Sequence, residues 1–355
     1  RDRSPSRGLG DVYKRQALGC VLAADLAGEL PLPGFDNSAM DGYAVRSAEV
    51  AGASPANPVT LPVTADIPAG DTRAHVLAPG TVMRIMTGAP IPEGADAIVP
   101  VELTDGGTAA VQVRGAVSPG QHRRRAGEDV QAGQLVLTAG TRLGPRQLAL
   151  AFSVGAVTVS VYPTPRVAVL STGDELVQAG TRPGFGQVID SNGPMLVQAL
   201  RESGFHAEPV IGVGDTVADV RRVLDGLLTV GADDDRGVDA VVTTGGVSMG
   251  AYDAVKEALS ALGTVEFTQV AMQPGKPQGA GYLRAPDGRA VPVFTLPGNP
   301  VSALVSLEVF VKPALRVMAG RPPFEVPAQA ATAAHDFGSP PDKTQFARVL
   351  SLIHI

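Results

Sequence analysis

The sequence predicts an α/β protein in which a mostly parallel sheet is wound with helices on both faces and is preceded by an elongated β-rich region. From residue 166 onwards, short apolar runs alternate with stretches of helical periodicity, as expected for such a sheet. Residues 17–165 carry short alternating runs separated by Pro and Gly turns, which indicate β structure. Two glycine-containing turns, at 243–250 and 296–300, each join a buried-strand pattern to a helix start. In the second turn, Asn299 can cap the helix and Pro300 can take its first position.

The β-rich region contains one predicted helix, at 145–154, which begins with Pro and is followed by Gly. Its many proline breaks do not suit one compact sheet. We therefore predict an elongated N-terminal domain, residues 17–46 and 138–165, and a small inserted barrel at 47–137.

The α/β domain is predicted to span residues 166–320. Its predicted strands lie at 167–170, 208–213, 238–242 and 265–272, its helices at 194–203, 217–230 and 252–262, and a hairpin-like pair of strands at 279–283 and 291–295. In the last helix, which ends before Gly320, the spacing of Val301, Leu304, Val305 and Val309 predicts the buried stripe.

Composition excludes several classes of protein. The chain has 355 residues, 44% of them hydrophobic, and its 29 Lys and Arg against 35 Asp and Glu argue against a nucleic-acid or anionic-membrane surface. No apolar run approaches the roughly 20 residues needed to span a bilayer, and no signal peptide is visible, so we expect a cytoplasmic protein. The single cysteine, Cys20, excludes an intrachain disulfide, and the five histidines lack zinc-ligand spacing.

Both ends of the sequence differ from the rest. Residues 1–16 are basic and without periodicity, and residues 350–355 form a short apolar tail. We interpret both as non-native; a native disordered basic arm is the alternative for the first.

Ligands of open parallel sheets bind outside the carboxyl ends of the strands. The loops that follow the predicted strands combine helix-start amides, which suit an anion, with five carboxylates and one lysine. These side chains are Asp174, Glu175, Asp190, Asp215, Asp253 and Lys276. Carboxylates beside phosphate-binding amides repel a bare phosphate, but a bridging divalent cation resolves the conflict, and oxygen ligands favour Mg²⁺.

Some of these residues also have a structural explanation. Thr216 and Asp219 fit a capping box, which leaves Asp215 free for function. Asp253 lies in the first turn of its helix and can complement the helix dipole, although Ser248 nearby favours a site.

For the remaining candidates, too, a structural explanation stands beside a functional one. Asp190 or Ser191 can cap the following helix, and this explanation weighs equally with function. Asp174 and Glu175 can be turn residues, but adjacent carboxylates after a buried strand favour function. Lys276 is the only cation in these loops, which favours an anion contact.

Eight segments, in order along the chain, closely resemble the molybdopterin molybdenumtransferase family, the molybdenum insertases that include the gephyrin E domain. They are FDNSAMDGYAV at 35–45, RIMTGAP at 84–90, AGEDV at 126–130, STGDEL at 171–176, DSNGPML at 190–196, TTGGVSMG at 243–250, PGKPQG at 274–279 and LPGNPVSAL at 296–304. The resemblance covers residues 17 to about 320.

The resemblance implies that adenylylated molybdopterin is cleaved with molybdate in a Mg²⁺-dependent step that releases molybdenum cofactor and AMP. It implies metal ligands at Asp174, Glu175, Asp215 and Asp253, which would be catalytic together with Lys276. The residues that it implies for binding of pterin nucleotide and molybdate are Asp41, Thr87, Asp129, Ser191, Asn192, Gly245, Gly246, Ser248, Gly250, Pro274, Gly275, Pro297, Gly298, Asn299, Pro300 and Ser302. Of these, Ser302 would lie near molybdate with Lys276.

The resemblance also implies a homodimer, in which Asp41, Thr87 and Asp129 reach the cleft of the other subunit, and it allows contact with the molybdopterin adenylyltransferase. Residues 321–349 resemble only a fragment of the family's C-terminal β domain, so we expect a truncated domain and an incomplete molybdate side of the cleft. Gln273 stands where some relatives have a lysine.

Two other functions remain open. A molybdopterin adenylyltransferase shares the α/β fold and performs the preceding step from ATP, but the long N-terminal region argues against it. A non-catalytic dimeric scaffold of the gephyrin type is the second, and the carboxylates and lysine of the predicted site favour an enzyme instead.

Overall fold

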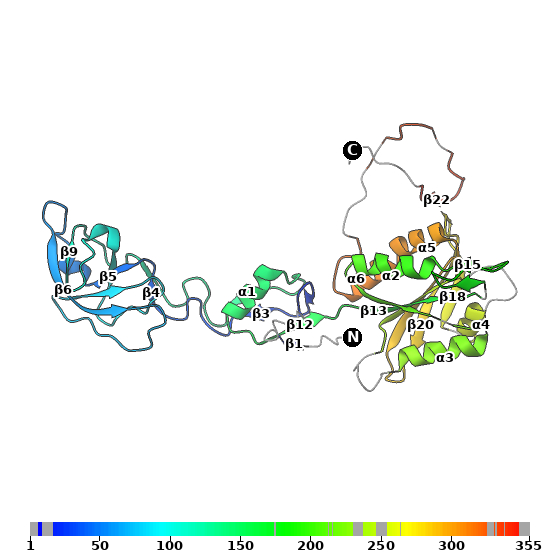
Figure 1. Cartoon of the computed structure of the whole chain (residues 1–355), viewed down its shortest axis with the longest axis horizontal. Helices are drawn as coiled ribbons and strands as arrows, with labels where there is room; N and C mark the ends of the chain where they lie inside the picture. Colours follow the sequence, from blue (N-terminus) through cyan, green and yellow to red (C-terminus); the bar gives the residue numbers. More distant parts are fainter. Residues whose placement is uncertain are drawn as a thin grey trace. The chain divides into compact units, whose positions relative to one another are not determined.

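The computed structural model describes residues 6–8, 17–173, 175–211, 213–214, 216–229, 237–245, 254–262, 264–324, 330, 332–336 and 338–347. The chain divides into two compact units, one built from residues 6–161 and the other mainly from residues 162–355. Figure 1 labels their helices and strands.

The second unit is built on a six-stranded sheet. In spatial order its strands are β16 (His206–Val210), β13 (Arg166–Ser171), β17 (Ala240–Thr244), β21 (Ala290–Leu296), β20 (Pro277–Arg284) and β18 (Val265–Gln269). The first four run parallel, and β20 is antiparallel to both of its neighbours. The predicted, mostly parallel sheet and its hairpin-like pair are therefore confirmed.

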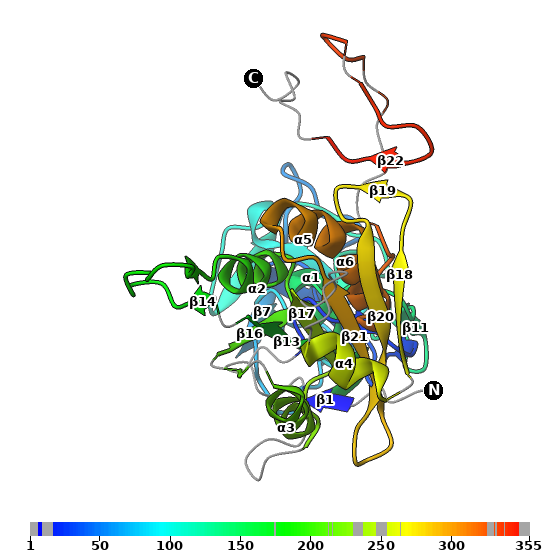
Figure 2. The ribbon, with the colours of Figure 1, turned by 90° about the vertical axis from the view of Figure 1, so that its right-hand side faces the viewer.

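Helices cover both faces of this sheet (Figures 1 and 2). One face is covered by α2 (Asn192–Glu202), α5 (Pro300–Ser306), the π-helical η3 (Leu307–Val311) and α6 (Lys312–Met318), and the other by α3 (Val217–Leu228) and α4 (Ala254–Ser260). Alternate side chains of a strand point to opposite faces of the sheet. Because helices cover both faces, β17 is buried throughout. Val242 packs with the first group of helices and Val241 with the second.

The buried face of the last helix differs from the prediction. Val301, Leu304, Val305 and Val309 are only partly buried. The buried positions are instead Ser302, Ala303, Ser306, Leu307, Val311 and Leu315. Apolar residues occur on both sides of this helix, so periodicity alone does not choose between them. The small residues at 302, 303 and 306 select the buried face, since they allow the helix backbone to approach its neighbours closely.

Two short parallel pairs extend this unit: β14 (Leu176–Val177) with β15 (Val188–Ile189), and β19 (Met272–Gln273) with β22 (Thr344–Gln345). The predicted strand at 265–272 is divided, because β18 ends at Gln269 and the chain then turns.

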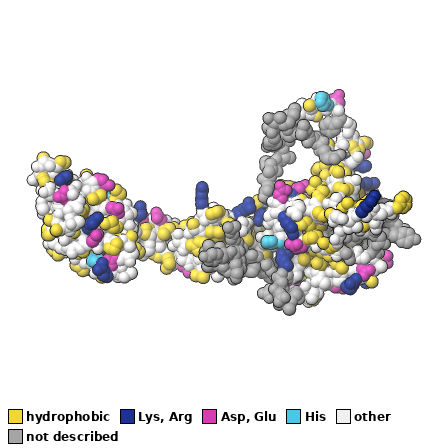
Figure 3. Space-filling view, in the orientation of Figure 1, with side chains coloured by type: hydrophobic (Ala, Val, Ile, Leu, Met, Phe, Trp, Pro, Cys, Tyr) yellow, Lys and Arg dark blue, Asp and Glu magenta, His cyan; other side chains and the backbone are white. Residues whose placement is uncertain are grey.

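Over the face shown in Figure 3, charged side chains of both signs are interspersed.

The first unit contains a five-stranded sheet in the order β8 (Ala97–Pro100), β5 (Gly42–Val45), β7 (Val82–Ile85), β6 (Val59–Ile67) and β9 (Ala110–Val113). It carries the 3₁₀ turns η1 (Ser47–Val50) and η2 (Val101–Leu103) and a hydrophobic cluster on each face. By sequence, 42–45 belongs to the elongated domain, but β5 pairs with β7 and β8 in this sheet.

The rest of the first unit is formed by short elements. They are β1 (Ser6–Gly8), β2 (Val21–Leu22), β3 (Leu26–Ala27), β4 (Asn37–Ser38), β10 (Arg123–Arg124), β11 (Leu135–Leu137), α1 (Pro145–Ser153) and β12 (Thr158–Tyr162). The predicted helix at 145–154 is confirmed as α1, and Gly155 follows it with a φ of 85°. Among the described residues, no helix is long and apolar enough to cross a membrane.

Candidate functional site

The described start of the first predicted glycine turn, at Gly245, lies beside the second turn at the carboxyl edge of the six-stranded sheet. Thr244 pairs with Leu296, so β17 and β21 end together, and the Gly245 N–H donates to the Leu296 carbonyl oxygen at 3.1 Å. A Cβ on Gly245 would lie 3.2 Å from the Thr172 carbonyl oxygen, and one on Gly298 would lie 3.7 Å from the Gly245 Cα. Gly245 also has a φ of 88°, which favours glycine. The turns after β13, β17 and β21 therefore meet with backbone against backbone.

Asn192, the first residue of α2, joins these turns. Its Nδ2 donates to the Thr244 Oγ1 at 3.0 Å and to the Gly298 carbonyl oxygen at 2.7 Å. Its Oδ1 is buried and has no hydrogen-bond partner among the residues that the structure describes. Asn192 thus braces the start of α2 against both turns, and its predicted contact with a ligand stays a prediction.

Asp190 and Ser171 meet at Gly193. The Asp190 Oδ1 accepts a hydrogen bond from the Gly193 N–H at 3.0 Å, so Asp190, and not Ser191, caps the start of α2. A Cβ on Gly193 would lie 2.7 Å from both the Asp190 Oδ2 and the Ser171 Oγ, so any larger residue at this position would have to displace these two side chains. The Ser171 Oγ is buried, and no described residue forms a hydrogen bond with it.

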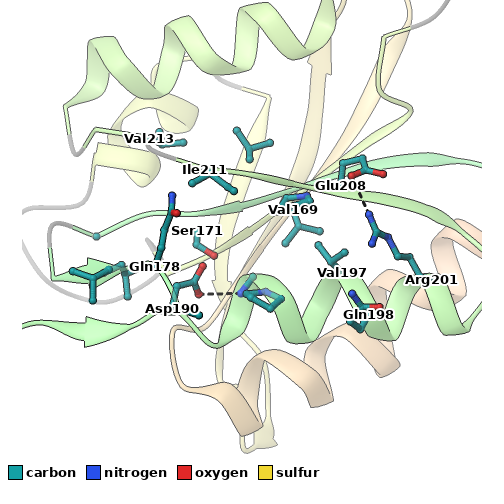
Figure 4. Close-up of a pocket in the computed structure, with 18 residues that line it drawn as sticks. Val169, Ser171, Gln178, Asp190, Val197, Gln198, Arg201, Glu208, Ile211 and Val213 are labelled. Carbon is teal, nitrogen blue, oxygen red and sulfur yellow. Dashed lines mark hydrogen bonds and ion pairs between the residues drawn. The ribbon is translucent and has the colours of Figure 1, made fainter. Parts of the chain in front are cut away.

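A pocket of about 560 Å³ opens beside these residues, between α2 and the ends of β13 and β16 (Figure 4). Its walls are apolar at Val169, Val197, Ile211 and Val213, and polar at Ser171 and Asp190. Arg201 and Glu208 form an ion pair of 2.9 Å in the lining. This volume falls within the roughly 300–1,000 Å³ of small-molecule sites.

The turn after β21 has the predicted cap. The Asn299 Oδ1 accepts hydrogen bonds from the N–H groups of Val301 (3.1 Å) and Ser302 (3.2 Å), and Pro300 occupies the first helical position. Because Asn299 occupies these two donors and proline has no N–H, the amides of residues 300–302 are not open to an anion in this conformation.

Lys276 lies in a tight loop between β18 and β20. Its side chain is exposed, and its carbonyl oxygen accepts a hydrogen bond from the Val270 N–H at 2.8 Å. Pro274 is partly buried, and Gly275 is buried with a φ of 95°. The Gln278 Nε2 donates to the Gly275 carbonyl oxygen at 2.7 Å and to the Ser306 Oγ at 2.6 Å. Sequence reasoning did not single out Gln278 and Ser306. The signals were that Gln278 lies within the family-like segment at 274–279 and that Ser306 is polar within an apolar stretch.

Several predicted site residues lie outside the described residues, namely Asp174, Asp215, Gly246, Ser248, Gly250 and Asp253. Glu175 is exposed, and its carbonyl oxygen accepts from the Val188 N–H at 2.8 Å. The predicted helix cap at Thr216 is present, since its Oγ1 accepts from the Asp219 N–H at 3.1 Å. In the part of the chain that the structure describes, no three His, Cys, Asp or Glu side chains are grouped as metal ligands would be.

In the first unit, the structure brings three of the family-like segments together. The Asp41 Oδ1 accepts hydrogen bonds from the Thr87 N–H (2.6 Å) and Oγ1 (2.7 Å), and the Thr87 hydroxyl is the main cause of a lowered pKa at Asp41. Asp36 accepts hydrogen bonds from the Ala126 N–H at 2.8 Å and the Arg123 Nη2 at 2.7 Å. Asp129, in the third segment, is exposed, and its N–H donates to the Leu32 carbonyl oxygen at 2.9 Å.

The wound sheet and the turns at its carboxyl edge define an α/β domain of the ligand-binding type. Residues 168–317 match the family described as probable molybdopterin binding domain, and residues 9–155 match the MoeA N-terminal region (domain I and II). The chain belongs to the molybdopterin molybdenumtransferase family.

Individual relatives agree with this assignment. The chain is 47% identical to molybdopterin molybdenumtransferase 2 of Mycobacterium tuberculosis, over 94% of this chain and 81% of that protein. It is 40% identical to molybdopterin molybdenumtransferase 1 of the same organism, over 86% of this chain and 73% of that protein. A crystal structure of the molybdopterin biosynthesis moeA protein from Pyrococcus horikosii matches with a TM-score of 0.71 and 32% identity, over 89% of this chain and 75% of that one.

Proposed function

We propose that this chain is a transferase of molybdenum cofactor biosynthesis that inserts molybdenum from molybdate into molybdopterin. The observation that carries the proposal is the 47% identity to a molybdopterin molybdenumtransferase over 94% of the chain. The geometry supports it, because the turns at Gly245 and Gly298 and the pocket beside Ser171 lie at the sheet edge where ligands of this fold class bind.

In finer detail, the substrate is adenylylated molybdopterin, the step depends on Mg²⁺ and AMP is released. The pocket is large enough for one of the two ring systems of such a substrate. The described carboxylates at this edge, Glu175 and Asp190, offer the oxygen donors that suit Mg²⁺. Asp174, Glu175, Asp215 and Asp253 would hold the ion, which would offset the charge of the pyrophosphate.

The chain's own residues would bind and orient the reacting groups. Asn192 holds the Gly245 and Gly298 turns together, so their backbone groups face the substrate with little reorganisation. The ammonium group of Lys276 would attract molybdate. In a homodimer, Asp41, Thr87 and Asp129 of one subunit would complete the site of the other, and the enzyme would act in the cytoplasm.

Incubation of the whole chain with adenylylated molybdopterin, molybdate and Mg²⁺, followed by measurement of AMP, tests the function. Release of AMP that requires molybdate is expected, and Asp253→Ala is expected to lose it while keeping the fold. Release of pyrophosphate from ATP and molybdopterin would instead identify an adenylyltransferase. Absence of both reactions, together with absence of AMP binding, would identify a scaffold.

A further inference from the structure

Gln278 connects two parts of the chain that the proposed function assigns to molybdate. It is the second residue of β20, and its side chain is 7% exposed. Its Nε2 donates to the Gly275 carbonyl oxygen, next to Lys276, and to the Oγ of Ser306, which is fully buried. One amide group therefore ties the lysine loop to α5.

The point of attachment on α5 lies one turn from Ser302. Residues four apart share a helix face, and Ser302 and Ser306 are both buried. The hydrogen bond from Gln278 to Ser306 therefore fixes the distance between the Lys276 loop and the first turn of α5. The loop is also fitted to this position, since a Cβ on Gly275 would lie 3.0 Å from the Ser306 Oγ and 3.1 Å from the terminal methyl of Met272.

We propose that Gln278 is a positioning residue for oxyanion binding, which holds Lys276 at a constant distance from Ser302. This proposal rests on the proposed function only in naming molybdate as the oxyanion. Gln278 itself is buried and its donors are used, so it acts through the loop and does not touch the anion.

Gln278→Met tests the role, because methionine keeps the length of the side chain and removes both donors. In the whole chain, we expect the apparent KM for molybdate to rise about tenfold, with kcat nearly unchanged, because ground-state binding is what is lost. The KM for adenylylated molybdopterin should stay within about twofold of the parent value. Ser306→Ala removes one of the two bonds and should raise the KM for molybdate less, and the double variant should be no worse than Gln278→Met, because the two residues share one bond.

Leu283→Met is the control for methionine itself, since it introduces the same residue at a buried position of the same strand away from the loop and removes no hydrogen bond. It should leave both KM values unchanged. Equal rises in both KM values for Gln278→Met, or a similar rise for Leu283→Met, would show a general structural effect and overturn the proposal. If Gln278→Met does not fold, Ser306→Ala alone decides: an unchanged KM for molybdate then overturns it.

A second readout separates this proposal from the proposed function. Sodium molybdate is titrated calorimetrically into the parent chain and each variant without the pterin substrate. A parent that binds molybdate without releasing AMP would contradict the proposed function, and weaker molybdate binding by Gln278→Met would still support the positioning role. Equal affinity in parent and variant, or no binding by the parent, would refute the role.

Discussion

The side-chain amide of Asn192 donates to the carbonyl oxygen of Gly298 at 2.7 Å, although the two residues are 106 positions apart in the sequence. The same amide reaches Thr244 on the neighbouring strand. One side chain therefore joins a helix start to two strand ends at the edge where the fold class binds ligands.

Replacement of Asn192 by alanine leaves the Gly298 carbonyl oxygen and the Thr244 hydroxyl without this donor. Each lost hydrogen bond costs about 0.5–1.5 kcal/mol, so we expect kcat/KM for adenylylated molybdopterin to fall about tenfold or more. Steady-state AMP release measures the effect. Glu202→Ala, an exposed change at the far end of the same helix, is the control and should behave as the parent. An unchanged kcat/KM in Asn192→Ala would remove the brace from the mechanism.

Two glycine-to-alanine changes in helices should shift stability in opposite directions. Alanine at Gly193 places a Cβ 2.7 Å from the Asp190 Oδ2 and the Ser171 Oγ, so we expect a loss of about 1–3 kcal/mol in the free energy of unfolding. Gly226 in α3 is exposed and a Cβ there meets nothing within 4 Å, so alanine should stabilise by about 0.5–1 kcal/mol. Urea denaturation of both variants checks the sign, and a stabilising Gly193→Ala would contradict the structure.

Asp36 should contribute to stability in a pH-dependent way. The Ala126 N–H, and then the Arg123 guanidinium, lower the pKa of Asp36 below its ordinary value of 3.8. A carboxyl whose pKa is lower in the folded state stabilises the fold above its unfolded pKa, and this contribution is lost as the pH falls through the folded pKa. Asp36→Asn should therefore be less stable than the parent near neutral pH. The difference in stability should narrow as the pH falls from neutral through 3.8 and below the lowered pKa of Asp36. Urea midpoints of both proteins measured across this fall in pH check it, and a constant difference would contradict the prediction.

Mixing two variants that are each expected to be inactive tests whether the chain forms a homodimer with a shared site. Asp41→Asn removes a carboxylate of the first unit, and Lys276→Ala removes the ammonium group of the second. If each site combines residues from two subunits, co-refolded or co-expressed mixtures should recover about a quarter of the parent activity, since half of the dimers then hold one intact site. Recovery is not expected when either variant is mixed with itself. A mixture that stays inactive although heterodimers form would place both residues in one subunit's site.

The sequence alone predicted most of the helices and strands of the second unit, and its prediction of a site at the carboxyl edge of the sheet stays a prediction. Buried strands and amphipathic helices each have a local periodicity in the sequence. The wound sheet, the helix α1 and the hairpin-like pair could therefore be predicted from the sequence. The caps at Thr216 and Asn299 were also found, because capping involves residues two or three apart. The family resemblance rested on short segments that follow one another in the family's order. The matches to the family's domains and relatives confirm the family.

Tertiary structure decided which side chains meet across long separations. The contacts of Asn192 with Gly298 and of Gln278 with Ser306, and the pairing of β5 with β7, join segments whose spacing carries no local signal. Packing also decided which face the last helix buries, since that face combines small side chains at 302, 303 and 306 with Leu307, Val311 and Leu315. Local chain preferences act over a few residues, whereas these contacts depend on how whole elements fit together, and only the folded chain determines that fit.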